Sequence, residues 1–397
     1  MNKSNNPKKR KGKSLFSRFV AWVHLWPSIV SGIILVFVCL TGTIIVYCDE
    51  IMDFSAGEAR YVQVPANPQR ISAVQLAASL KKSNPDFSVS EYVFFKDPHR
   101  SIRVRAFIPK DRKLVQVYVN PYTGKVIKVD RSIYFFFVTA HLHSSLLAGK
   151  AGGWVVAVST IIFVISTITG LILWWPKKWT RATKEASFTI RWKARFKRLN
   201  YDLHNVFGFY SLIICFILGL TGLIIFFHPM MEATVKLTGG DPAPMETLFP
   251  QYDSTQTDQD LVAIGFAALD KKFGDKKMIS IWLESRNPSG AFVYRSGIAG
   301  LKSNADTQWY IVNRYTGDEI TVPKASLQHE KTENAVWQLH MGQWLGQLGK
   351  LTTFLSGIIA TTLPVTGFLI WWGRRKKSKK KSKEIKKVHQ HRTQVYE

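Results

Sequence analysis

Four long apolar stretches without a single Asp, Glu, Lys or Arg constrain the fold of this chain more than any other feature. They cover residues Ser28–Cys48, Gly152–Trp175, Asn205–Phe227 and Leu351–Trp372. Each exceeds the roughly 20 residues that a helix needs to cross a hydrocarbon core of about 30 Å. We therefore predict four transmembrane helices, although the 46% hydrophobic content of the 397 residues would by itself also suit two or three soluble domains.

The basic residues gather in three short segments beside the apolar stretches. The formal net charge is +27, and 27 of the 54 Lys and Arg residues lie within residues 3–18, 177–198 and 374–392. Because Lys and Arg favour the cytoplasmic side of a membrane, we expect both termini and the middle loop in the cytoplasm. Residues 49–150 and 229–348 should then lie outside. This distribution argues against nucleic-acid binding, and the Lys-rich tail suits contact with anionic lipids.

The N-terminus has the basic and apolar regions of a signal peptide, but its apolar run exceeds the usual length of about 7–15 residues. No small-x-small cleavage site follows it, so we predict an uncleaved membrane anchor. The three cysteines, Cys39, Cys48 and Cys215, lie in or at the end of apolar stretches and form no CxxC motif. The sequence therefore indicates neither a disulfide framework nor a thiol redox site.

The two outer segments repeat each other. Val-Asn-x-Tyr-Thr-Gly occurs at residues 119–124 and again, 193 residues later, at 312–317. This motif is a turn signal, because Gly readily adopts positive φ. Apolar periodicity before each turn predicts a helix and then an antiparallel sheet. The expected helices cover 71–82 and 261–273, and the expected strands include 101–108, 113–119, 292–296 and 308–312.

The histidines take part in the same duplication. A shift of 180 residues aligns His24 with His204 and Thr41-Gly42 with Thr221-Gly222. A shift of 197 residues aligns His143 with His340, Thr169-Gly170 with Thr366-Gly367, and Trp174-Trp175 with Trp371-Trp372. We therefore predict a tandem repeat. Ionisable residues are costly in or against a membrane, so their recurrence in both halves suggests paired ligands.

A helix-and-sheet module that ends in Asn-x-Tyr-Thr-Gly, followed by Leu-His, spaced glycines, Thr-Gly and Trp-Trp, resembles the PepSY-associated transmembrane family. The resemblance covers Trp22 to Arg375. It implies a bacterial inner-membrane protein, often iron-regulated, and one branch of the family consists of haem-containing siderophore reductases. The family name also carries a proposed peptidase-inhibitory role for the isolated module, which the residues neither support nor exclude.

These features together predict an α+β membrane protein. It should have four transmembrane helices in two tandem repeats, each with an extracytoplasmic PepSY-like domain of a helix and an antiparallel sheet. Glycines 149, 152 and 153 should separate an interfacial helix over 132–147 from the second span, and 334–345 should form its counterpart. The expected segments are a basic tail (1–18), helix 1 (19–48), outer domain 1 (49–131), interfacial helix and helix 2 (132–176), a basic loop (177–200), helix 3 (201–228), outer domain 2 (229–332), interfacial helix and helix 4 (333–373), and a basic tail (374–397).

The predicted topology places one histidine pair at each membrane face. His24 and His204 lie at the cytoplasmic ends of their helices, whereas His143 and His340 lie just outside. A haem iron with two axial imidazoles needs one His from each of two facing elements, and helix bundles often build such sites. We therefore expect two b-type haems with these four residues as iron ligands. Such ligation leaves no open iron position and favours electron transfer.

Other residues receive weaker roles in this prediction. Gly42, Gly170, Gly222 and Gly367 would allow a flat macrocycle to approach the backbone, or they serve plain helix packing. His141 is a donor near the site, a propionate contact, or the ligand in place of His143. His228 aligns with Cys48 and is the other possible substitute. Zinc is the competing chemistry, but His141-x-His143 without nearby Cys, Asp or Glu is a poor tetrahedral set.

Two function classes remain open from the sequence. In the first, an oxidoreductase passes electrons from a quinol or a reductase through two haems to an external acceptor, which by resemblance is ferric siderophore iron. No catalytic acid, base or nucleophile is expected, because the cofactor carries the chemistry. In the second, a non-enzymatic PepSY membrane anchor binds a peptide, a peptidase or an envelope partner, and its histidines are structural. A partner flavoprotein is a third possibility, since the chain lacks a dinucleotide fingerprint.

Overall fold

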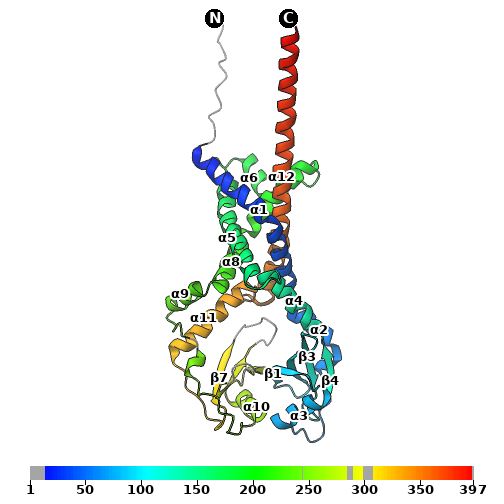
Figure 1. Ribbon diagram of the computed structural model, residues 1–397, viewed down its shortest axis with the longest axis vertical. Coiled ribbons are helices and arrows are strands. Elements are labelled where there is room, and N and C mark those ends of the chain that lie inside the picture. The colour runs from blue at the N-terminus through cyan, green and yellow to red at the C-terminus, as the bar shows by residue number, and fades with distance from the viewer. Residues whose placement is uncertain (1–13, 244, 284–288, 298–306, 396–397) are drawn as a thin grey trace. The chain divides into compact units, whose positions relative to one another are not determined.

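The computed structural model (Figure 1) describes residues 14–243, 245–283, 289–297 and 307–395. For residues 376–395 it describes the backbone alone. The chain divides into two compact units. Unit 1 comprises residues 1–40, 154–219 and 355–397, and unit 2 comprises 41–153 and 220–354. The predicted basic tails, residues 1–18 and 374–397, are only partly described. Residues 1–13 and 396–397 lie outside the described residues.

Four helical runs are long and apolar enough to cross a membrane. They are α1 (Leu15–Ile45), α5 (Gly149–Trp174), the run α7 (Phe196–Asp202), η2 (Leu203–Phe207) and α8 (Gly208–Phe226), and α12 (Gly346–Val395). Their apolar parts coincide with the four charge-free stretches of the sequence, so the prediction of four long apolar helices is confirmed. The protein is therefore a multi-pass membrane protein with four candidate spans.

Shorter helices flank the apolar ones. They are α2 (Cys48–Ala56), η1 (Gly57–Arg60), α4 (Ser132–Ser145), α6 (Arg181–Phe188), α9 (His228–Leu237), η3 (Met245–Leu248) and α11 (Lys324–His340). Leu146 caps the end of α4 and Gly149 begins α5, both with positive φ. Of the three glycines predicted to separate the two helices, Gly149 lies at the break, whereas Gly152 and Gly153 lie within α5. α11, however, begins ten residues before the expected Asn334, directly after Pro323, because proline fixes a backbone angle that suits a helix start.

Both segments that were predicted to lie outside contribute to one seven-stranded antiparallel sheet of order β4-β3-β2-β1-β5-β6-β7. The strands are β1 (Ser88–Phe95), β2 (Ile102–Ile108), β3 (Lys113–Val119), β4 (Val126–Asp130), β5 (Met278–Trp282), β6 (Ala291–Ser296) and β7 (Gln308–Asn313). The sequence predicted a sheet in each segment. The structure instead joins the two sets of strands through β1 and β5, with Tyr92 opposite Ile281. β1 buries five consecutive residues, Glu91–Phe95, and therefore lacks the alternation that marks a half-buried strand.

Helices α3 (Ala73–Ser83) and α10 (Leu261–Lys271) cover one face of this sheet (Figure 1). Leu76 and Leu269 of these helices pack with Phe94 and Tyr294 of the sheet in one buried apolar cluster. Asp260 caps α10 by accepting from Val262 N at 2.9 Å, and it also accepts from Ala73 N at 3.0 Å. One carboxylate thus fixes the starts of the equivalent helices from the two segments.

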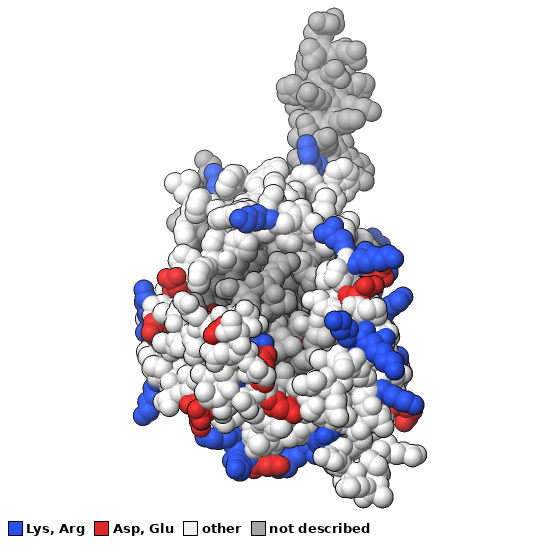
Figure 2. Space-filling view, turned by 60° about the horizontal axis from the view of Figure 1, so that its bottom comes forward, with Lys and Arg blue, Asp and Glu red and all other residues white. Residues whose placement is uncertain are grey.

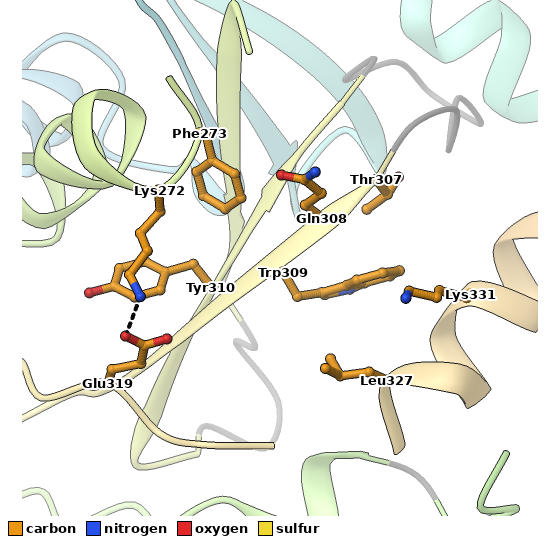
Figure 3. Close-up of a pocket in the computed structure, with 9 residues that line it drawn as sticks. All are labelled: Lys272, Phe273, Thr307, Gln308, Trp309, Tyr310, Glu319, Leu327 and Lys331. Carbon is orange, nitrogen blue, oxygen red and sulfur yellow. Dashed lines mark hydrogen bonds and ion pairs between the residues drawn. The ribbon is translucent and has the colours of Figure 1, made fainter. Parts of the chain in front are cut away.

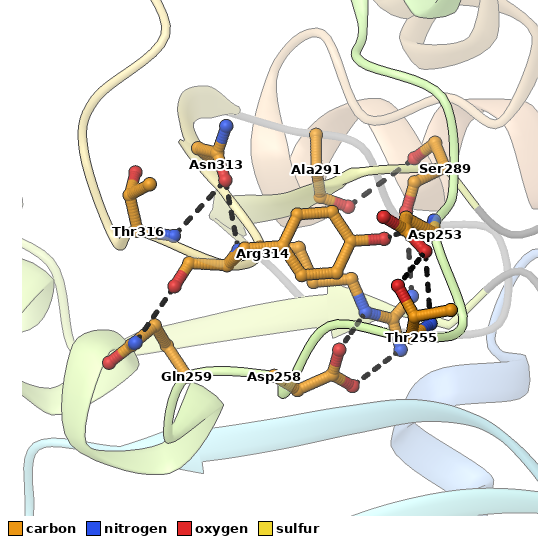
Figure 4. A network of polar contacts seen from close by, with 10 residues as sticks. Asp253, Thr255, Asp258, Gln259, Ser289, Ala291, Asn313, Arg314 and Thr316 are labelled. Atoms are coloured by element: carbon orange, nitrogen blue, oxygen red, sulfur yellow. Dashed lines mark hydrogen bonds and ion pairs between the residues drawn. The ribbon is translucent and has the colours of Figure 1, made fainter.

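The repeated Asn-x-Tyr-Thr-Gly motif forms the same turn in both segments. Asn120 Oδ1 accepts from the two following Tyr and Thr amides at 2.8 and 3.2 Å, and Asn313 Oδ1 does so at 2.9 and 3.1 Å (Figure 4). Gly124 and Gly317 close the turns with φ of 70° and 77°. Such φ values favour glycine, which explains the motif.

Charged side chains of both signs are interspersed on the face shown in Figure 2. Unit 2 contains exposed ion pairs, such as Lys272 with Glu319 at 2.6 Å and Lys96 with Asp270 at 3.8 Å. Exposed pairs of this kind each add little stability. Unit 2 therefore presents charges of both signs, in contrast to the strongly basic segments at residues 177–198 and 374–392.

Candidate functional site

Two histidines from different helices lie side by side in unit 1. His24 stands on α1, and His204 lies in η2, a π-helical turn that interrupts the third apolar run. Their ring centroids are 6.4 Å apart, and the ring planes are inclined by 78°. The structure thus brings together His24 and His204, which are 180 positions apart in the sequence. We call them the inner pair, because the predicted topology puts them at the cytoplasmic face.

Both helices are irregular next to these histidines. π-Helical turns are rare, and they often occur at functional sites. In α1, Pro27 follows His24 by three residues and cannot donate the usual backbone hydrogen bond. Each inner histidine therefore sits where the regular helical hydrogen bonding is interrupted.

A threonine hydroxyl holds each inner imidazole at its Nδ1 atom. Thr169 Oγ1 on α5 lies 3.1 Å from Nδ1 of His24, and Thr366 Oγ1 on α12 lies 2.9 Å from Nδ1 of His204. Both hydroxyls donate to carbonyl oxygens one turn earlier in their own helices, at 2.8 and 3.0 Å. With the hydroxyl proton used in this way, each oxygen can accept, so the tautomer with the proton on Nδ1 satisfies both groups. The Nε2 atom then keeps a lone pair that suits a metal ion.

The glycine after each of these threonines makes room for the imidazole. A Cβ atom on Gly170 would lie 3.2 Å from Cε1 of His24, and one on Gly367 would lie 3.2 Å from Cε1 of His204. Such separations are tighter than ordinary van der Waals contact. The predicted close approach at these glycines is therefore made, in this structure, by the imidazole rings themselves.

A second histidine pair lies in unit 2. His143 on α4 and His340 at the end of α11 have ring centroids 6.0 Å apart and ring planes inclined by 52°. Thr221 Oγ1 on α8 lies 3.0 Å from Nδ1 of His340, and a Cβ on Gly222 would lie 3.2 Å from Cε1 of the same ring. A Thr-Gly dipeptide therefore contacts this histidine in the same way as at the inner pair.

Gly42 on α1 makes the closest approach of all. A Cβ atom added to it would lie 2.7 Å from Cε1 of His143 and 3.0 Å from its Nδ1. Real side chains do not occupy such a position, so any larger residue here must displace the imidazole. Gly42 thus fixes how near His143 can lie to α1.

The spacing within both pairs suits two imidazoles on one iron. Imidazole nitrogens bind first-row metal ions at about 2.0–2.1 Å, which places two ring centroids on opposite sides of one ion roughly 6–6.5 Å apart. The observed separations are 6.4 and 6.0 Å. Within the described part of the chain, no group of three or more His, Cys, Asp and Glu side chains gathers to hold a metal ion. Two-histidine sites fit a haem, whose porphyrin supplies the remaining ligands.

The two alternative histidines point elsewhere. His141 is exposed, and its Nδ1 lies 2.8 Å from the carbonyl oxygen of Phe137 in its own helix. His228 begins α9, is 76% exposed and lies 3.8 Å from Glu232. Neither of them joins the pair that His143 forms with His340.

An ion pair ties α2 to the start of α12 within unit 2. Lys350 Nζ lies 2.7 Å from Glu50 Oε1, which also accepts from Gln347 at 3.0 Å. The Lys350 side chain is only 10% exposed. Burial by itself would raise the pKa of Glu50, but the bonds from Lys350 and Gln347 outweigh it and lower that pKa below its usual value.

The threonines are the site residues that the sequence reasoning missed. Thr169, Thr221 and Thr366 served only as markers of the repeat, and the glycines beside them received the functional role. The signal was present, because a threonine precedes the glycine in all four aligned dipeptides. A hydroxyl one residue before a close-approach glycine is placed to bond the same ring that the glycine admits.

Comparison with known proteins agrees with this architecture. The profile of the PepSY-associated TM region family matches residues 21–374, a range that includes the sheet and both histidine pairs. A comparison with curated proteins finds no match. The chain belongs to the PepSY-associated TM region family.

Proposed function

We propose that this protein is a di-haem oxidoreductase of the bacterial inner membrane that passes electrons to an extracytoplasmic acceptor. The observation that carries this proposal is the presence of two histidine pairs, each spaced for one iron. His24 and His204 would hold one b-type haem, and His143 and His340 the other. When bound, haem supplies a one-electron carrier, and the protein positions it and tunes its potential.

The chain's own residues prepare the ligands for this role. Thr169, Thr366 and Thr221 hold the Nδ1 atoms of three histidines, which fixes the ring orientation and directs Nε2 to the iron. A haem held by two histidines would keep no coordination position for oxygen or water. The arrangement therefore suits electron transfer rather than chemistry on a bound oxygen species.

The proposed placement of one haem near each membrane face follows from the charges and from the repeat. The basic segments favour cytoplasmic termini, which puts His24 and His204 near the cytoplasmic face and the sheet outside. We further propose that the chain is two tandem copies of one unit, each with a PepSY-like domain. The matched turns at Asn120 and Asn313 support this, as does a sheet order in which β1 and β5 meet at the centre.

The proposed acceptor is the ferric iron of a siderophore, and this part rests on the family resemblance. When bound, haem would supply the single electron that reduces Fe(III) to Fe(II). Hydroxamate and catecholate oxygens are hard donors that hold Fe(III) better than Fe(II), so reduction loosens the chelate. The electron donor would be a quinol or a partner reductase.

Spectroscopy of the purified protein tests the proposal. Protein from haem-replete cells should contain two haems per chain, and its Soret band should sharpen and shift on reduction with dithionite. A ferric hydroxamate complex should then reoxidise the reduced protein. A colourless preparation contradicts the haem proposal, whereas red protein that no ferric chelate reoxidises contradicts only the proposed acceptor.

A further inference from the structure

The two outer edges of the sheet differ. At one edge, β4 pairs with β3 along Gln116–Val119. At the other edge, the chain that follows β7 makes a single bridge, Val312 with Glu319, and then leaves. The part of β7 before Ile311 therefore has no neighbouring strand on its outer side among the residues that the structure describes.

The sequence explains why β4 has no counterpart beside β7. The shift of 193 residues that aligns the two turns also aligns Asp130, the last residue of β4, with Pro323. Proline has no N–H group for a strand ladder, and α11 begins at the next residue. The second segment thus turns into a helix where the first completes its strand.

The uncovered edge of β7 directs backbone groups outward at Trp309. Ile311 O accepts from Ile320 N at 2.8 Å, and Asn313 N donates to Asp318 O at 2.7 Å. The backbone N–H and C=O groups of the odd-numbered residues of β7 therefore point away from β6. Trp309 follows the same alternation. An edge with such groups is a template for pairing with another chain.

A cavity of about 260 Å³ opens at this edge (Figure 3). Trp309 and Tyr310, being adjacent in the strand, face opposite sides of the sheet, so the cavity offers two different surroundings. One side has Tyr310 and Phe273, and the other has Trp309 and Lys331. Lys272 pairs with Glu319 at 2.6 Å at the rim.

Two donors meet on the Trp309 side. The Nε1 atom of Trp309 is buried and has no hydrogen-bond partner in the described structure. Lys331, which comes from α11, points toward the indole ring in Figure 3. An ammonium group directed at an indole with an unused N–H offers two donors that suit a carboxylate.

We propose that this edge docks an extended peptide segment of a partner protein, which adds a strand antiparallel to β7 and places a carboxylate opposite Trp309. The first segment shows the pattern, because β4 places Asp130 opposite Gln116, the residue that aligns with Trp309. The preceding residue of β4, Val129, lies opposite Val117, which aligns with Tyr310. The ligand class is thus an extended segment in which an apolar residue precedes Asp or Glu. This docking is independent of the haem proposal.

A synthetic copy of β4 is the probe that tests the idea. A fluorescein-labelled peptide of residues 124–130, amidated at its C-terminus, is titrated with the full chain in detergent micelles and followed by anisotropy. We expect saturable binding that falls about tenfold or more when the peptide's Asp is changed to Asn. N-methylation of that Asp amide should weaken binding to a similar degree, because it removes the backbone bond to Trp309.

Protein variants locate the site. Trp309→Phe, which keeps a ring but loses the N–H, and Lys331→Glu should each weaken binding about tenfold or more. Lys271→Glu is the matched control, since it makes the same charge change on an exposed lysine of α10 that does not line the cavity. The changes made in the peptide keep the test valid if a protein variant fails to fold.

Several results would overturn the proposal. They are the absence of saturable binding, equal binding of the N-methylated or Asn peptide, and equal losses from Lys271→Glu and Lys331→Glu. Competition by N-acetyl-aspartate amide as effective as that by the peptide would also overturn it, since only a carboxylate would then be recognised.

Discussion

Replacing Thr366 by Val tests whether the threonines prepare the histidines for metal binding. The change removes the Oγ1 atom that lies 2.9 Å from Nδ1 of His204 and keeps the shape of the side chain nearly constant. The Nδ1 proton then loses its acceptor in a part-buried position. A buried donor without a partner costs about 1–3 kcal/mol, so the ring should turn or bind iron less well.

Two magnitudes follow for the inner site. Loss of such a partner to a metal-bound histidine typically lowers metal affinity about 10–100-fold, and we expect a loss in this range. The Nδ1 bond also makes the imidazole a better donor to Fe(III), so its removal should raise the reduction potential. A difference of about 0.5–1 kcal/mol between the two oxidation states corresponds to roughly 20–45 mV.

Haem transfer to apomyoglobin and a spectroelectrochemical titration measure these two quantities. Thr366→Ser keeps the hydroxyl and should behave like the unaltered protein. Thr362→Val is the matched control, because it removes an exposed hydroxyl one turn earlier on α12 that bonds only Ile359 O in the structure. Unchanged affinity and potential in Thr366→Val would refute the reasoning, as would equal changes in Thr362→Val.

Three further predictions follow from the geometry. Gly42→Ala should lower the haem content per chain more than Gly222→Ala, because the added Cβ would lie 2.7 Å from one imidazole and 3.2 Å from the other; equal losses count against this. Lys350→Met should lower the free energy of unfolding by about 1–2 kcal/mol, less than for a fully buried pair because Glu50 is 37% exposed; an unchanged Tm in detergent contradicts it. Burial raises the pKa of Glu330, so the folded state binds its proton more tightly and stability should fall as pH rises from about 4 toward that raised value. Glu330→Gln should remove this fall, and Tm measured at pH 4.5 and 7.5 checks it.

The parts of the fold that the sequence predicted are those with a strong periodic or compositional signal. The four apolar runs, the helices near 71–82 and 261–273 and the strand at 113–119 were visible because one pattern dominated each. β1 was not, since its last five residues, Glu91–Phe95, are all buried and do not alternate. β5 was not visible either, because its five residues are too few for the Ile-Ser-Ile alternation to stand out. Their pairing joins the two segments, so the single sheet depends on a long-range contact that no local pattern encodes.

The candidate site was likewise predicted only in part. The repeat alone indicated which histidines belong together, and the structure brings those residues to within 6.4 and 6.0 Å. The sequence did not distinguish His141 from His143, because both stand on one short helix. Residues two positions apart on a helix point in nearly opposite directions, so only the packing of α4 decides which ring meets His340.

Counting low-spin haem in double variants tests the central claim most directly. A chain that lacks His24 and His204 should keep one low-spin haem, and so should a chain that lacks His143 and His340. A chain that lacks His24 and His143 leaves neither iron with two imidazoles, so its low-spin spectrum should disappear. Retention of a low-spin haem in this last variant would contradict the account, because the ligands would then be grouped by sequence half and not by the pairs seen in the structure.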